Sequence, residues 1–457
     1  MEKTTWFHIG LPKTGSSALQ RFLTINEEAL RAHGVLYPRS GRLYHCHTLL
    51  ARELVGAPCP PVPAQLRRFA PVEGQDQASF WDCLAAEIAG ASCPDVVVSS
   101  EAFYSCPHRF RTAVVGVAGR WNVRIIVYLR PQDTFLESLY GQAMKWAPYT
   151  SLSIAQFAQQ HWVQDRLDYH ANLELMAKTL GPEAIVVRIY DRRRLRGNIF
   201  RDFLSILGIA PSSRLVFPSE IVNPSPSPRA IAVLRRLNEL ELPPAERACL
   251  VERLIAKLGP AKPMAEKGLL SGTFRRDLLA KYEASNAELA RRLLGRKDGR
   301  LFPKDLEPEA PPLRTAARET PSPAEIDAII QEIRQECHDG IFPPVASRAF
   351  PVCRPSYLDL LRRQSRPVVI WGASQAGGRV LYHLLNGGIE PAWFVDSDSG
   401  KVGKRIFRWE VRSPEELNHR SRRKPWVVIG SMWAWEIAER LESWGYRPEE
   451  DYFINDV

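Results

Sequence analysis

The sequence has no long apolar run. Among its 457 residues no stretch of about 18 apolar residues occurs, so no transmembrane helix is expected. The first residues enter a strand-like stretch at once and lack a signal-peptide pattern. Both absences favour a cytoplasmic protein. Its content of 45% hydrophobic and 25% charged residues is ordinary for a globular chain.

Cysteine is scarce and scattered. The eight cysteines show no paired spacing, which argues against a disulfide framework. His45, Cys46 and His47, followed by Cys59, include residue types that bind zinc, but no Cys-x-x-Cys pair accompanies them. We therefore expect no metal site.

A nucleic-acid-binding signature is also missing, although the net charge is +10. Part of that charge comes from short basic runs at 192–194 and 420–424, and each run is typical of a solvated face. The positive excess therefore points to a small anionic ligand or substrate.

Composition divides the chain into three regions. Residues 1–305 alternate β-branched apolar runs with helical patterns, which predicts an α/β domain whose parallel sheet is flanked by helices. Residues 306–365 are rich in proline around one helical stretch, Ala324–Glu336, as is typical of a linker. Residues 366–457 resume the alternation and predict a small Rossmann-like α/β domain.

The elements expected in these regions follow from the period of the apolar residues. The strands expected in the first domain are Trp6–Gly10, Val96–Ser100, Val123–Leu129 and Ile185–Tyr190. Its expected helices are Ser17–His33, Thr134–Trp146, Asn198–Leu207, Arg229–Leu240 and Phe274–Leu294. The strands expected in the last region are Val368–Trp371, Trp393–Asp396 and Trp426–Ile429.

The most informative segment follows the first strand. It runs Pro12-Lys13-Thr14-Gly15-Ser16-Ser17, directly before a helical pattern. A strand–loop–helix unit of this kind points backbone N–H groups and a helix N-terminus at one spot, where an anion binds. The lysine adds a positive charge and the hydroxyls add donors. We therefore expect residues 12–17 to hold a phosphate-like group.

The position of the lysine narrows this prediction. In a nucleotide-triphosphatase P-loop the lysine follows the last glycine, whereas Lys13 precedes Gly15. The order here resembles the 5′-phosphosulfate loop of the sulfotransferases, which take a sulfuryl group from 3′-phosphoadenosine 5′-phosphosulfate. The resemblance implies that residues 12–17 bind this donor.

A second segment supports the resemblance. The strand Val123–Leu129 is followed by Arg130, and Ser138 lies in the helical pattern after it. Sulfotransferases carry an arginine and a serine at this spacing, and the two bind the 3′-phosphate of the donor. A planar guanidinium at a strand end and a hydroxyl in the next helix can hold one phosphate together. An arginine at a strand end can also be a surface ion-pair residue.

The resemblance also implies catalytic roles. Lys13 would stabilise charge on the oxygen that bridges phosphorus and sulfur, with no metal required. Glu101 ends the strand-like run 95–100, and this strand end commonly delivers the base to the acceptor in sulfotransferases. Glu101 is our first choice of base, and its alternative role is to stabilise a helix start. His47 and His45 are competing bases, and either can instead be a buried structural histidine.

The sequence thus predicts a sulfotransferase that modifies a hydroxyl or amino group, with a carbohydrate as the expected acceptor. Two alternatives remain open. One is a P-loop phosphotransferase, which would bind ATP with magnesium. The other is a non-catalytic nucleotide-binding scaffold in a glycan-biosynthetic complex.

The last region contains a glycine-rich turn, residues 372–377, of the form G-x-G-x-x-G with serine at the middle glycine. Asp396 lies where a ribose-binding acid would follow the next strand. Similar small Rossmann-like modules are attached to glycan-modifying enzymes and nucleotide-sugar proteins. The region is therefore either a structural module that can contact a protein partner, or a binder of a nucleotide or sugar nucleotide.

Overall fold

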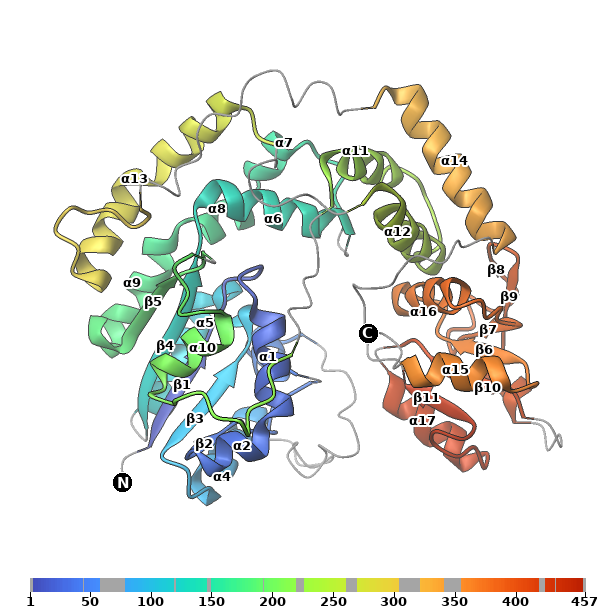
Figure 1. Ribbon diagram of the computed structural model, residues 1–457, viewed down its shortest axis with the longest axis horizontal. Coiled ribbons are helices and arrows are strands. Elements are labelled where there is room, and N and C mark those ends of the chain that lie inside the picture. The colour runs from blue at the N-terminus through green and yellow to red at the C-terminus, as the bar shows by residue number, and fades with distance from the viewer. Residues whose placement is uncertain are drawn as a thin grey trace. The chain divides into compact units, whose positions relative to one another are not determined.

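The structure is a computed structural model, and it divides into two compact units (Figure 1). It describes residues 3–43, 45–57, 79–118, 121–145, 149–191, 193–218, 226–259, 269–303, 321–340, 355–418, 424–431 and 433–454. Unit 1 comprises residues 1–140, 153–222 and 269–312, and unit 2 comprises residues 141–152, 223–268 and 313–457. Unit 2 therefore contains segments from the middle of the chain besides the region after 366. Most of the proline-rich stretch expected as a linker lies outside the described residues.

Unit 1 is built on a five-stranded parallel sheet in the order β2-β3-β1-β4-β5. The strands are β1 (Thr4–His8), β2 (Val35–Leu36), β3 (Asp95–Ser99), β4 (Asn122–Leu129) and β5 (Ile185–Ile189). Four of them were predicted. The two-residue β2 is too short to give a periodic signal. Helices flank this sheet, and the predicted α/β fold class is confirmed.

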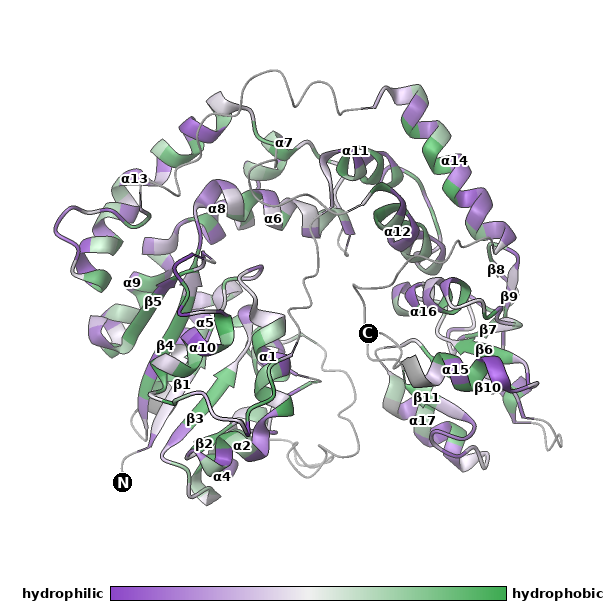
Figure 2. Ribbon diagram, in the orientation of Figure 1, coloured by the Kyte–Doolittle hydropathy of each residue, from purple (hydrophilic) through white to green (hydrophobic). Residues whose placement is uncertain are grey.

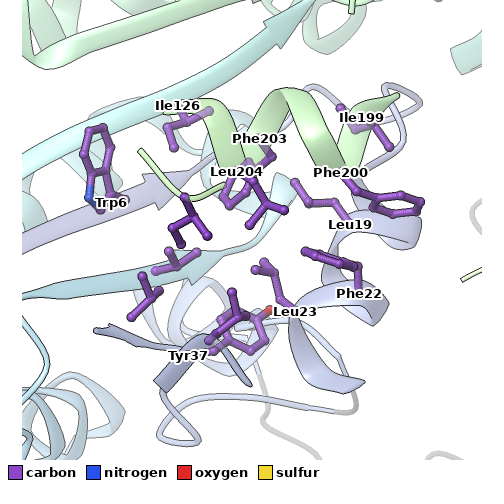
Figure 3. Close-up of a cluster of buried hydrophobic side chains, with 14 of the residues drawn as sticks. Trp6, Leu19, Phe22, Leu23, Tyr37, Ile126, Ile199, Phe200, Phe203 and Leu204 are labelled. Carbon is purple, nitrogen blue, oxygen red and sulfur yellow. The ribbon is translucent and has the colours of Figure 1, made fainter. Parts of the chain in front are cut away.

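One hydrophobic core of unit 1 lies between the sheet and two helices, α1 (Ser16–Ile25) and α10 (Ile199–Ile206). Figure 3 shows Leu19, Phe22 and Leu23 of α1 opposite the apolar side chains of α10. The rings of Phe22 and Phe200 pack with their centroids 5.1 Å apart. Burial of each such side chain stabilises the fold by about 1.5–3 kcal/mol. The core therefore fixes α1, and with it the loop that precedes α1.

The helix expected over Ser17–His33 is two helices, α1 and α2 (Glu27–Ala32), which meet at Asn26. The Asn26 amide donates to the carbonyls of Phe22 and Val216, each over 2.8 Å, and its Oδ1 accepts from the Val216 N–H. Asn26 keeps its backbone bond to the Phe22 carbonyl, but its φ of −108° and ψ of 16° depart from the helical conformation, and the helix breaks there. A single-helix prediction was wrong because no local pattern announces that contact.

The remaining helices of unit 1 surround the sheet. They are α3 (Thr48–Leu54), α4 (Phe80–Gly90), α5 (Pro107–Ala118), α6 (Gln132–Lys145), α7 (Ile154–Ala158), α8 (His161–Leu167), α9 (Tyr169–Leu180) and α13 (Gly272–Leu294). The last residues of α6 belong to unit 2. Short 3₁₀ helices occur at Glu101–Ser105 and Pro182–Ala184. α10 begins where Asn198 Oδ1 accepts the Arg201 N–H, which satisfies one unpaired donor of its first turn.

Unit 2 contains a six-stranded sheet in the order β11-β10-β6-β7-β9-β8. The strands are β6 (Val368–Trp371), β7 (Trp393–Val395), β8 (Arg405–Ile406), β9 (Trp409–Arg412), β10 (Trp426–Ile429) and β11 (Tyr452–Ile454). All neighbours are parallel except β8 and β9, which are antiparallel. The Rossmann-like alternation predicted from the sequence is confirmed.

The helices of unit 2 are α11 (Pro228–Leu237), α12 (Pro244–Leu258), α14 (Pro323–Asp339), α15 (Pro355–Arg363), α16 (Gln375–Asn386) and α17 (Ala434–Ser443), and a 3₁₀ helix spans Pro414–Leu417. α14 shows polar and apolar bands along its length (Figure 2). Its apolar side packs on α11 and α12. α12 also packs closely on α16: a Cβ added at Gly378 would lie 2.0 Å from the Ala245 carbonyl oxygen.

None of the helices in the described ranges is both long enough and apolar enough to cross a membrane. The cysteines within these ranges are free thiols. Cys59 lies outside the described residues.

Candidate anion and transfer site

The loop after β1 continues beside β4 before it turns into α1. The Leu11 N–H donates to the Tyr128 carbonyl over 3.2 Å. Lys13 and Gly15 then adopt left-handed backbone conformations, with φ of 67° and 81°. Glycine adopts this conformation without steric cost, whereas for lysine it is sterically unfavourable. Two left-handed residues turn the chain so that Ser16 begins α1.

One hydroxyl of this loop is used within the loop itself. The Thr14 hydroxyl donates to the Leu11 carbonyl over 2.7 Å, so its proton stabilises the loop itself. Ser16 is buried, Ser17 is exposed and Pro12 is half-buried. The first N–H groups of a helix have no partner within it, and those of α1 lie directly after the turn. Residues 12–17 thus lie at a helix N-terminus, and their binding of an anion stays a prediction.

Tyr190, the first residue after β5, closes one side of this loop. A Cβ added at Gly15 would lie 3.3 Å from the ring and from the hydroxyl of Tyr190. Gly15 is therefore constrained twice, by its positive φ and by this neighbour.

Arg130 joins the second motif to the loop. Its side chain is 6% exposed, and its Nη1 donates to the Lys13 carbonyl over 3.0 Å. Its Nε donates to Thr134 Oγ1 over 3.2 Å, and the Tyr169 hydroxyl donates to the Arg130 carbonyl over 2.9 Å. Side chain and backbone are both held. The two segments singled out in the sequence, 117 residues apart, therefore meet at one place.

Ser138 lies on the same side of α6 as the residue that holds Arg130. It follows Thr134 by four residues, and residues at this spacing share a helix face. Its side chain is buried, with 4% exposure. Ser138 and Thr134, which accepts from Arg130, thus lie on the same side of α6. That Arg130 and Ser138 bind one phosphate together stays a prediction.

Lys13 lies in the electric field of two other charged residues. Burial lowers the pKa of Lys13 to about 8, while Glu101 opposes this shift and Arg130 adds to it. A lysine with a lowered pKa retains a proton near neutral pH but is close to losing it. The positive charge of Lys13 therefore changes with pH around pH 8.

Glu101 follows β3 and lies against the loop. A Cβ added at Gly10 would lie 3.1 Å from the Glu101 Cβ. The Gln20 amide donates to Glu101 Oε2 over 2.9 Å. Among the described residues no donor reaches Oε1, so that oxygen is available to a ligand. Gln20 was not predicted, and its signal is a polar residue on the otherwise apolar face of α1.

His47 has both ring nitrogens in hydrogen bonds. Nδ1 accepts from the Ser99 N–H over 3.1 Å, so Nε2 carries the proton and donates to the Pro38 carbonyl over 3.0 Å. Burial lowers the pKa of His47 to about 3. A neutral ring with both nitrogens bonded acts as a structural bridge and has no lone pair for an acceptor proton. His45 contributes its carbonyl, which accepts from the Tyr37 hydroxyl over 2.6 Å.

A buried charge cluster fixes α6 against α13. Arg275 of α13 pairs with Asp133 and with Glu137, the latter over 2.9 Å. Gln132 and Asn286 exchange two amide hydrogen bonds of 2.8 and 3.0 Å. The sequence assigned no role to Asn286. These contacts hold the helix that carries Ser138.

An open basic pocket of about 580 Å³ lies elsewhere in unit 1. Its lining residues come from the loops after β5 and α13: Arg194, Arg296, Lys297, Asp298, Arg300 and Pro303. Phe302 of the same loop packs edge-on against Tyr169, which in turn bonds Arg130. Four cationic side chains and one carboxylate line the pocket, so its charge favours an anion. None of these residues was predicted from the sequence.

The glycine turn of unit 2 is closely packed. Gly372 has φ of 128°, and a Cβ there would lie 2.1 Å from the Gly430 carbonyl oxygen. Asp396 Oδ2 accepts from the Ala373 N–H over 2.7 Å and pairs with Lys401 over 3.1 Å. The carboxylate considered for a ribose is thus bonded to the turn itself. Within the described residues, no group of His, Cys, Asp or Glu is placed to hold a metal in either unit.

No family model matches the chain. An uncharacterised protein of Archaeoglobus fulgidus is 33% identical over 212 residues, which are 44% of this chain and 55% of that protein. The chain thus spans little more than half the length of that relative. A crystal structure of a sulfotransferase from Alicyclobacillus acidocaldarius aligns with 64% of this chain and 97% of its own, at 14% identity and a TM-score of 0.36.

Proposed function

We propose that unit 1 is a sulfotransferase that moves a sulfuryl group from 3′-phosphoadenosine 5′-phosphosulfate to a hydroxyl or amino group of a carbohydrate. The observation that carries the proposal is the hydrogen bond from Arg130 to the Lys13 carbonyl. It brings a loop suited to a 5′-phosphosulfate next to an arginine and a serine suited to a 3′-phosphate. A nucleotide that carries both groups would occupy both sites.

Each residue then has a chemical task. The α1 N-terminus and Lys13 hold the 5′-phosphosulfate, and Arg130 with Ser138 holds the 3′-phosphate. Glu101 Oε1 accepts the proton of the acceptor hydroxyl while the acceptor oxygen bonds to sulfur. The bond from sulfur to the bridging oxygen breaks, and its electron pair stays on that oxygen as 3′,5′-adenosine diphosphate leaves. Protonated Lys13 stabilises the charge that develops there.

The geometry favours Glu101 over His47 as the base. Glu101 lies against the loop at Gly10 and has one oxygen available. His47 uses both nitrogens to join Ser99 and Pro38.

Calorimetry with 3′,5′-adenosine diphosphate, with and without magnesium, tests the proposal. We expect binding that needs no magnesium and that weakens roughly 10–100-fold in Arg130→Ala, because a buried charge-assisted hydrogen bond is lost. Arg124→Ala is the matched control, since Arg124 lies at the other end of β4 over the Trp6 ring.

An acceptor-dependent turnover assay must follow, because a scaffold would also bind the nucleotide. Absence of binding would refute the proposal. Binding of ATP that requires magnesium would favour a phosphotransferase, and nucleotide binding without transfer to any acceptor would favour the scaffold.

A further inference from the structure

Arg42 is a buried cation in the segment between β2 and α3. Its side chain is 5% exposed, and its Nη2 pairs with Glu27 Oε1 at 2.5 Å. The guanidinium lies over the Tyr37 ring, 5.2 Å from the ring centroid. Glu27 also pairs with Arg39 at 3.0 Å. Two arginines thus share the Glu27 carboxylate, and the Glu87 carboxylate accepts from the backbone N–H groups of Arg39 and Ser40.

The guanidinium of Arg42 is only partly satisfied. Its Nε and Nη1 are buried and have no hydrogen-bond partner in the part of the chain that the structure describes. Arginine does not lose its proton in proteins, so burial cannot be relieved by neutralisation. Buried donors of a charged group are costly unless an acceptor pairs with them. A ligand that brings oxygen acceptors would meet this need.

The segment that carries Arg42 is bound to the strand end beside Glu101. The His47 N–H donates to the Ser99 carbonyl over 2.8 Å, and the Ser99 N–H donates to His47 Nδ1. Ser99 precedes Glu101 by two residues. The His47 ring also packs edge-on against Tyr37, at 4.9 Å between centroids, and Tyr37 is the ring under Arg42. A continuous set of contacts therefore links Arg42 to the candidate base.

Electrostatics agree with this placement. Burial is the main cause that raises the pKa of the Cys46 thiol to about 11, Glu101 raises it further, and Arg42 lowers it. Both charges thus act on one sulfur atom. Arg42 and Glu101 therefore lie near the same thiol.

We infer that Arg42 binds a carboxylate of the acceptor while Glu101 faces the hydroxyl to be modified. The acceptor class is then an acidic carbohydrate, such as a polymer that contains uronic acid. This inference rests on the proposed sulfuryl transfer and adds the charge of its substrate.

The test compares a glucuronic-acid-containing polysaccharide with the same polymer after its carboxylates have been reduced to alcohols. We expect wild-type kcat/KM to be at least tenfold higher on the acidic polymer, with the difference mainly in KM. Arg42→Gln should lower that ratio at least tenfold, and Arg42→Lys should keep part of it because the charge remains.

Arg39→Gln is the matched control, since Arg39 pairs with the same Glu27 but its side chain is 41% exposed. Affinity for 3′,5′-adenosine diphosphate verifies that each variant is folded. Equal transfer to both polymers, no transfer to the acidic one, or an unchanged ratio in Arg42→Gln would each overturn the role of Arg42. If the wild-type protein does not bind 3′,5′-adenosine diphosphate, the sulfotransferase proposal itself is refuted.

Discussion

At the scale of single residues, the site of unit 1 depends on how three charges are separated. Lys13 lies between a carboxylate, Glu101, and a second cation, Arg130, and it responds to both. Glu101 keeps one oxygen open because Gln20 bonds only the other. The carboxylate is therefore oriented without being neutralised by a direct ion pair, as a base that must accept a proton requires.

Replacement of Glu101 tests its role as base. Glu101→Gln preserves size and the contact with Gln20 but cannot accept a proton, so we expect kcat to fall by roughly 10²-fold or more. Steady-state turnover with a saturating acceptor measures the effect. Glu28→Gln, an exposed carboxylate on α2, is the control and should keep its turnover. Near-normal turnover in folded Glu101→Gln would exclude this residue as the base.

The lowered pKa of Lys13 predicts a pH dependence of ligand binding. The anion binds the protonated lysine, which predominates below pH 8, so affinity for 3′,5′-adenosine diphosphate should be constant there. Above pH 8 the free protein loses this proton, and affinity should fall up to about tenfold per pH unit. Calorimetry from pH 6.5 to 9.5, on the order of six points, measures the profile.

Lys13→Arg is the matched variant for this profile. Arginine stays charged throughout the range, so its affinity should not change with pH. A profile of the same steepness in both proteins would assign the titration to another group.

The sequence pointed to Lys13 and Arg130 more clearly than to Arg42 and Gln20. Lys13 and Arg130 each belong to a local pattern whose strand and helix could be recognised, and parallel strands bring such patterns to one edge. Arg42 and Gln20 have no such pattern. A loop arginine is usually exposed, and only the tertiary contacts with Tyr37 and Glu27 show that Arg42 is buried.

At the scale of elements, the close packing of α16 on α12 in unit 2 depends on a glycine, Gly378, which has no side chain. Gly378→Ala would place a methyl group against the Ala245 backbone, so α16 and α12 must move apart. We expect the free energy of unfolding to fall by about 1–3 kcal/mol. Chemical denaturation of the full chain, followed by tryptophan fluorescence, measures it.

Gly116→Ala provides the comparison. Gly116 is an exposed residue of α5 with open space around its Cβ position. Alanine there should leave stability unchanged or raise it by up to about 1 kcal/mol, because alanine favours the helix. Equal behaviour of the two variants would mean that α12 and α16 do not pack through Gly378.

At the scale of the whole molecule, the fold class could be predicted from the sequence. The division of the chain into two compact units could not. Near-continuous runs such as Val96–Val98 and Ile125–Leu129 are typical of parallel strands covered on both faces, and they are buried in the structure. Residues 141–152 and 223–268 carry no local feature that assigns them to unit 2. Their membership comes from long-range packing of α12 on α14 and α16, which periodicity cannot express.

The salt bridge between Glu137 and Arg275 has a consequence for biosynthesis. The two residues lie 138 positions apart, and Asp133 forms an ion pair with the same arginine. At roughly 5–20 residues per second, the ribosome adds Arg275 on the order of ten seconds after both carboxylates. During that interval α6 cannot bury its acidic face at low energetic cost. The nascent helix carrying Ser138 therefore reaches its final position late, after α13 has left the ribosome.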